Sequence, residues 1–238
     1  MQPLSYFLLF ITIILSGSSV FLFKKVSPGF LKLLLSFSGA FLFALTVLHL
    51  IPEVYHSSDT SIGMFILLGF FIQIILEFFS QGIEHGHIHI HKKQNAAFPY
   101  GIMLGLCLHS YLEGMPLVQH FSESGTQRSL LAGIILHHIP VAIALMTMFL
   151  QSGLNKKAAV MYLTLFALMA PMGALTGNFI SQSGFQNIPH LFDITMAVVI
   201  GIFLHISTTI LFESNEDHRF NYLKILIIAL GAGLAMLS

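Results

Sequence analysis

Long apolar stretches follow one another along the whole chain and are separated by short polar breaks. A transmembrane helix needs about 20 mostly apolar residues, so each stretch is long enough to cross a bilayer. The pattern predicts an all-α membrane protein in which the whole chain forms a single domain of eight transmembrane helices. We place these helices at residues 3–23, 29–51, 62–80, 98–119, 129–151, 158–180, 191–213 and 221–238.

The positive charges between these stretches indicate the orientation of the chain, because Lys and Arg accumulate in cytoplasmic loops. All of the ten Lys and Arg residues except Arg128 lie on one predicted side of the membrane. This asymmetry predicts extracytoplasmic N- and C-termini, which agrees with an even number of spans. The residues on the cytoplasmic side are Lys24, Lys25, Lys32, Lys92, Lys93, Lys156, Lys157, Arg219 and Lys224. The first span is expected to remain as a helix rather than act as a signal peptide, since its lysines follow the apolar run.

The composition argues against other classes of protein. Only 8% of the residues are charged, whereas soluble domains have about 25%. The net charge is zero with the 13 histidines counted as neutral, which argues against a nucleic-acid partner. Cys107 is the only cysteine, so neither an intrachain disulfide nor a thiolate metal cluster is expected. The chain has no GxxxxGK[ST] segment for ATP, and we expect no organic cofactor.

Ionisable residues inside the fourth and fifth spans suggest a metal site. His109 and Glu113 are four residues apart, which puts an imidazole and a carboxylate on one face of a helix. His137 and His138 precede Pro140, which is expected to bend the fifth span beside them. Buried ionisable groups are costly, and imidazole with carboxylate suits zinc, iron, nickel or cobalt. Hydrogen bonds or ion pairs between helices are the simpler alternative for any one of these histidines.

Other histidines and acids extend the set of candidate ligands. His205, deep in the seventh span, would be a compensating ligand or a proton acceptor. His49 and Glu53, also four apart, would line an outer entrance, with ordinary interfacial solvation as the alternative. The polar segment 81–97 is predicted to be a cytoplasmic loop whose composition favours metal binding, with a fortuitous polar linker as the alternative. Its histidines are His85, His87, His89 and His91.

The sequence HSYLEG at 109–114 resembles the fourth-span pattern His-Asn/Ser-x-x-Asp/Glu-Gly of the ZIP family of zinc and iron transporters. The resemblance implies an eight-helix bundle in which spans 1–3 and 6–8 form an inverted repeat around spans 4–5. It also implies transport of Zn²⁺ into the cytoplasm across the plasma (inner) membrane, with Fe²⁺, Mn²⁺ or Cd²⁺ as alternative cargo. Several glycines permit close helix approach within one chain or between two, so a homodimer stays open.

The chain departs from the family pattern in the fifth and sixth spans. His138 stands where the fifth-span pattern His-Glu-x-Pro-His-Glu has its first glutamate, and Val141 and Ala142 replace its last two residues. Ala170 stands where the sixth span often has glutamate. The resemblance implies a two-metal site in the family, so this chain is expected to retain one site. Its predicted ligands are His109, Glu113 and His137, with His138 as a substitute ligand.

The predicted function is therefore transport of a divalent metal ion through a site in the middle of the membrane. Because imidazole must be neutral to bind metal, affinity should fall as the pH drops toward about 6. The alternatives are an intramembrane zinc-dependent hydrolase, for which the chain lacks the HExxH motif, and a metal sensor that no longer transports. Val141 and Ala170 suggest the sensor directly.

Overall fold

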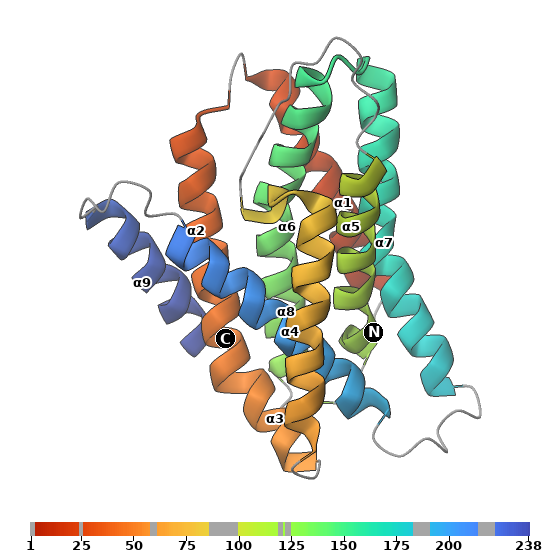
Figure 1. Cartoon of the computed structure of the whole chain (residues 1–238), viewed down its shortest axis with the longest axis vertical. Helices are drawn as coiled ribbons and strands as arrows, with labels where there is room; N and C mark the ends of the chain where they lie inside the picture. The colour runs from red at the N-terminus through yellow and green to blue at the C-terminus, as the bar shows by residue number, and fades with distance from the viewer. Residues whose placement is uncertain are drawn as a thin grey trace.

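A computed structural model describes residues 3–23, 26–57, 61–85, 100–118, 121, 125–182, 191–213 and 222–238 (Figure 1). Within these residues every regular element is helical, which confirms the predicted all-α fold. The helices are α1 (Pro3–Ser18), α2 (Pro28–Leu45), α3 (Ile51–Ser57), α4 (Ile62–Ser80), α5 (Tyr100–Gly114), α6 (Thr126–Gln151), α7 (Lys156–Gln182), α8 (Leu191–Glu213) and α9 (Tyr222–Met236). Short turns are η1 (Ser19–Leu22), η2 (Thr46–Leu50), η3 (Ile83–His85) and η4 (Met115–Val118).

The helical segments follow the spans predicted from hydropathy. In the described part of the chain, 7 segments are long and apolar enough to cross a membrane. One of these, Pro28–His56, joins α2, η2 and α3 into a single span. The predicted eighth span corresponds to α9, which is apolar but shorter than the others, at 15 residues. The orientation of the termini stays a prediction.

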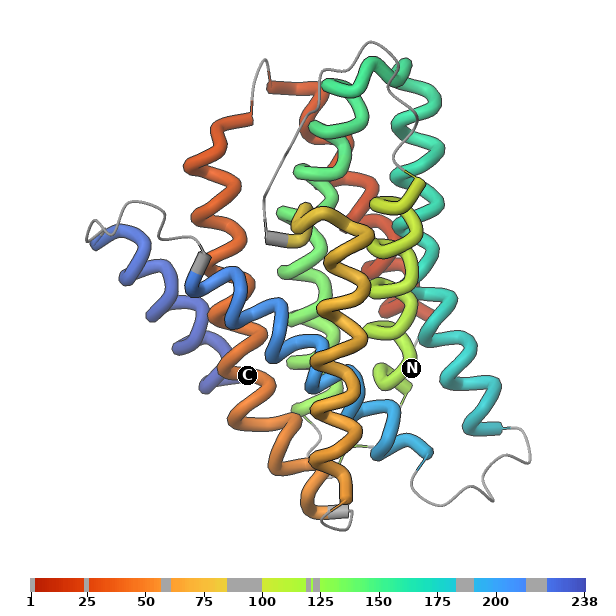
Figure 2. Tube along the Cα trace, in the orientation of Figure 1, coloured from red at the N-terminus to blue at the C-terminus, as the bar shows by residue number. Residues whose placement is uncertain are grey.

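Pairs of helices far apart in sequence pack side by side. Helix α4 packs on α8, and α2 packs on α9; α1 packs on α6, and α5 packs on α7 (Figure 2). An inverted repeat would make α1, α2 and α4 equivalent to α7, α8 and α9, and α5 equivalent to α6. Under this equivalence the pair α4–α8 corresponds to α9–α2, and the pair α1–α6 corresponds to α7–α5. The predicted inverted repeat would produce this pattern, although superposition of the two halves stays a prediction.

Glycines bring α5 and α7 into backbone contact. A Cβ atom built on Gly114 of α5 would lie 2.9 Å from the carbonyl carbon of Ala170 on α7 and closer still to its oxygen. Gly173 of α7 faces the backbone of α5 in the same way, at Tyr111. Small residues allow such close approach of membrane helices. The helix that carries His109 and Glu113 is therefore fixed to α7.

The chain reverses direction after α4 through two residues with left-handed backbone conformation. Gln81 has φ 54° and Gly82 has φ 72°. Such residues commonly end a helix, and an apolar residue that follows them often packs back on the structure. Here Ile83, which is 2% exposed, enters the apolar core. The turn η3 therefore contacts α6 and α8 instead of leaving the bundle.

Candidate metal site

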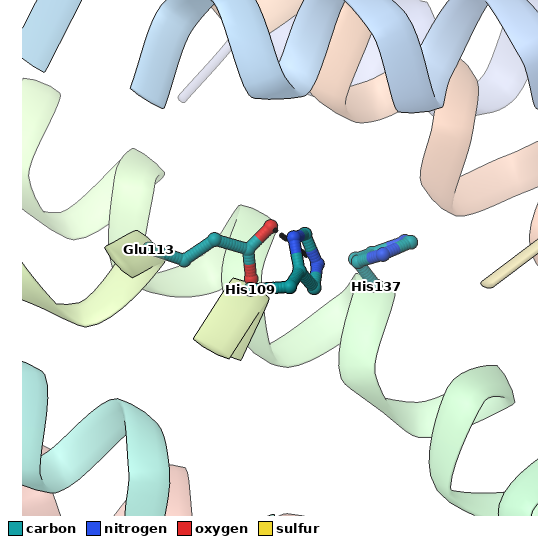
Figure 3. A group of neighbouring side chains, drawn as sticks. All are labelled: His109, Glu113 and His137. Carbon is teal, nitrogen blue, oxygen red and sulfur yellow. Dashed lines mark ion pairs between the residues drawn. The ribbon is translucent and has the colours of Figure 1, made fainter. Parts of the chain in front are cut away.

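Helices α5 and α6 bring the three predicted ligands into one buried group. His109 and Glu113 come from α5 and His137 from α6, and one ligand atom of each lies within 4.8 Å of the others. All three are at most 1% exposed. Figure 3 shows the Glu113 carboxylate turned toward the His109 ring, with the His137 ring on the far side of His109. The group is enclosed by protein in the middle of the bundle.

The contacts inside the group match the geometry expected from the sequence. The Nε2 atom of His109 lies 3.1 Å from Oε1 of Glu113, one helical turn away. The rings of His109 and His137 are nearly perpendicular, with centroids 6.0 Å apart. His109 Nδ1 has no hydrogen-bond partner in the part of the chain that the structure describes. Buried polar atoms without partners are costly, so such atoms at a ligand cluster indicate a ligand.

His138 lies next to this group and is oriented as a metal-binding histidine would be. Its Nδ1 lies 2.8 Å from the carbonyl oxygen of Ile134, which can only accept, so we assign the proton to Nδ1. The lone pair on Nε2 then faces Ser110 Oγ at 3.1 Å and Glu113 Oε2 at 3.5 Å. Histidines that ligate metal typically donate their other ring N–H to a carbonyl oxygen in this way, which fixes the tautomer. His138 is thus the fourth candidate ligand.

The Glu113 carboxylate lies between two imidazole nitrogens. His109 Nε2 is near one of its oxygens and His138 Nε2 near the other. A carboxylate and an imidazole lone pair repel each other unless a proton or a cation lies between them. The arrangement therefore suits a positive charge bound at Glu113. Two or more imidazoles with one carboxylate form a ligand set that fits Zn²⁺.

The substitutions at the other family positions are buried and apolar. Val141 on α6 is 1% exposed and Ala170 on α7 is 0% exposed. Both side chains belong to the apolar core clusters rather than to a polar pocket. These two positions therefore offer no ligand, and Glu113 is the only carboxylate within the three-residue group.

The remaining predicted ligands lie elsewhere in the described structure. His205 on α8 pairs with Glu77 on α4, and its ring packs edge-on against Phe70. His49, in the π-helical turn η2, lies with Nε2 3.0 Å from the carbonyl oxygen of Ala235 on α9. Roles of His205 and His49 in a metal pathway stay predictions, as does that of Glu53 in α3. His87, His89 and His91 lie outside the described residues, as does the side chain of His85.

Pro140 lies inside α6, which stays helical on both sides of it. The proline has no N–H to donate to the carbonyl oxygen of Leu136, one turn earlier. That carbonyl comes directly before His137 in the chain. A bend at this point stays a prediction.

Glu84 lies in the segment 81–97, which the sequence predicts to be a polar loop. In the structure Glu84 is 0% exposed, and its Oε2 accepts a hydrogen bond of 2.9 Å from Nε2 of Gln73 on α4. The signal that points to this position is the Gln81-Gly82 pair followed by apolar Ile83, which favours a chain reversal.

The fold and this site together define a polytopic membrane protein with a buried cluster of His and Glu side chains. The chain belongs to the ZIP zinc transporter family, because residues 84–238 match the family described as ZIP Zinc transporter. This match confirms the resemblance carried by the fourth and fifth spans. The protein is therefore an integral membrane protein.

Three relatives show how far the similarity extends. The chain is 28% identical over 175 residues to Protein zntD of Dictyostelium discoideum, a match that covers 66% of this chain and 25% of the relative. It is 27% identical over 166 residues to Zinc transporter ZIP9-A of Xenopus laevis, covering 66% of this chain and 55% of the relative. With Zinc transporter ZIP1 of Danio rerio it shares 25% identity over 154 residues, covering 63% and 50%. The chain thus spans about half the length of the ZIP9 and ZIP1 relatives.

Proposed function

We propose that this protein transports divalent metal ions, zinc first among them, across a membrane. The observation that carries the proposal is the fully buried group of His109, Glu113 and His137 between α5 and α6. An ionisable group in the middle of a membrane protein is costly, and such residues mark ion pathways. Three such residues whose ligand atoms lie within 4.8 Å of one another suit a bound cation better than they suit direct contacts among the three side chains.

In the proposed mechanism the ion loses its water and binds to imidazole nitrogens and to the Glu113 carboxylate. His109 and Glu113 move with α5, and His137 moves with α6, so the ligands come from two helices. A relative movement of these helices would open the site to one side of the membrane and then to the other. His138 would hold the ion as a further ligand through Nε2.

Zinc is the proposed cargo because the ligand set suits it and because the relatives named above include zinc transporters. Fe²⁺, Mn²⁺ and Cd²⁺ are alternative cargo. Transport toward the cytoplasm, location in the plasma membrane and assembly as a homodimer are further parts of the proposal. These three rest on the family resemblance and on the glycine pattern.

A metal sensor without transport activity is the second candidate. Val141 and Ala170 favour it, since both stand at positions where the family has ligands. The hydrolase alternative is not favoured, because the family to which the chain belongs is one of transporters.

The experiment is zinc influx into liposomes that contain the purified protein and a zinc-sensitive dye. Influx should be saturable, and His109→Ala and His137→Ala should each abolish it. His56→Ala is the matched control, because His56 is an exposed histidine at the end of α3. Zinc binding without influx by folded protein would support the sensor. Influx that persists unchanged in both variants would exclude this site as the pathway.

A further inference from the structure

The carboxyl group of Glu84 is buried and only half satisfied. Its Oε2 accepts the hydrogen bond from Gln73, whereas its Oε1 has no hydrogen-bond partner in the described part of the structure. Residue Glu84 is 0% exposed. A buried carboxyl oxygen without a partner is unfavourable unless a cation or another donor uses it. The Oε1 atom of Glu84 is therefore placed to bind a cation or a hydrogen-bond donor.

The fold places this carboxyl group beside the helix that carries two of the candidate ligands. The turn η3 contacts α6 and α8, and in Figure 1 it follows the gold-coloured α4 and crosses toward α6. Helix α4, whose Gln73 holds Glu84, packs on α5 at Gly105, four residues before His109. The left-handed residues Gln81 and Gly82 hold η3 in this position.

The net charge of the site with a bound cation indicates what the Glu84 carboxylate would do. A divalent cation bound to neutral imidazoles and to the Glu113 carboxylate leaves a net charge of +1 in a buried region. An uncompensated buried charge is costly, whereas a second carboxylate makes the group neutral. The positions that supply acidic ligands in the family hold Val141 and Ala170 here. Glu84 is another buried carboxyl group, and it approaches from a different element.

We propose that Glu84 is the second carboxylate of the ion site and replaces, from η3, the acidic groups that α6 and α7 lack. It neutralises the bound cation and serves as the ligand on the side where the segment 81–97 begins. Gln73 positions it through the hydrogen bond to Oε2. This inference rests on the proposed function, because it needs a cation at His109 and Glu113.

The test is zinc binding by the purified chain of 238 residues in detergent, measured by titration calorimetry. The histidines of segment 81–97 are replaced by alanine in all samples so that they do not add sites. Glu84→Gln removes the charge and keeps an oxygen that can accept from Gln73. We expect zinc affinity to fall about tenfold or more, together with a smaller rise in melting temperature on adding zinc. Asp193→Asn, in the first turn of α8, is the matched control and should bind as the parent does.

An affinity for zinc within twofold of the parent in Glu84→Gln would overturn the inference. If Glu84→Gln does not fold, Glu84→Asp replaces it, since the shorter side chain keeps the charge but withdraws the oxygens. Weaker binding at an unchanged zinc-free melting temperature is then the expected result, and unchanged binding again overturns the inference. His109→Ala distinguishes a failure of the proposed metal site from a failure of the role of Glu84 alone. If it leaves binding intact, the proposed site itself is wrong; if it abolishes binding and Glu84→Gln does not, only the role of Glu84 is wrong.

Discussion

Gly114→Ala tests whether backbone contact between α5 and α7 sets the position of the metal ligands. The new Cβ atom would lie 2.9 Å from the carbonyl carbon of Ala170 and 3.0 Å from its Cα. Carbon atoms in contact are normally about 3.5–4.0 Å apart. The two helices must therefore separate by about 0.6 Å or more at this point, because backbone atoms cannot rotate away as a side chain could.

The loss of stability in Gly114→Ala follows from this overlap. Overpacking of a well-packed interior typically costs about 1–3 kcal/mol, and the better helix propensity of alanine offsets at most about 1 kcal/mol of it. At about 2–4 °C per kcal/mol for a chain of this size, the melting temperature should fall by several degrees. The displacement also moves Glu113, the neighbouring residue, by a distance comparable to the tolerance of a metal site.

The assay is thermal unfolding in detergent, with zinc affinity measured on the same preparation. Gly233→Ala is the matched control, because a Cβ atom on Gly233 of α9 would meet nothing within 4 Å. This control should keep or slightly raise the melting temperature and leave zinc affinity unchanged. A Gly114→Ala protein that melts and binds zinc like the parent would refute the reasoning, since the helices would then have room for a methyl group.

Three further predictions concern contacts away from Gly114. His49→Ala removes the bond from η2 to the Ala235 carbonyl and should lower the free energy of unfolding by about 1 kcal/mol, measured by thermal unfolding. Glu77→Gln and His205→Gln should be non-additive by about 0.5 kcal/mol or more in a double-mutant cycle, whereas additive losses would mean that the α4–α8 pair is not coupled. Zinc affinity should fall steadily between pH 7.5 and pH 6 in calorimetry, because protons compete with the ion for the imidazoles; affinity that is constant over this range would exclude histidine ligands.

The hydropathy pattern was enough to predict the helices because lipid imposes the same requirement on every span. The predicted spans 62–80 and 191–213 coincide with α4 and α8. Each apolar run ends where polar residues begin, so local composition alone determines the boundary. The π-helical turn at Thr46–Leu50 was not predicted. Pro52 follows it and cannot donate a backbone hydrogen bond, and the helix adjusts around this missing donor.

The candidate site was predictable where it depended on spacing within one helix, and not where it depended on packing. The four-residue separation of His109 and Glu113 placed both on one face of α5, and the structure agrees. The burial of Glu84 depends on the reversal at Gln81 and Gly82 and on the packing of Ile83, which are tertiary effects. The polar sequence around Glu84 is more typical of an exposed loop than of a buried turn.

The close glycine contacts between α5 and α7 also have a mechanical consequence. Helices in backbone contact at Gly114 and Gly173 cannot slide past each other without separating. On α6, the three atoms nearest to a Cβ built on Gly133 belong to side chains of α2, which can adjust. His109 and Glu113 would therefore move with one body, α5 and α7, whereas His137 would move with α6 as another. Zinc holds its nitrogen ligands at about 2.0–2.1 Å, so a slip of about 1 Å between the two bodies would be enough to release the ion.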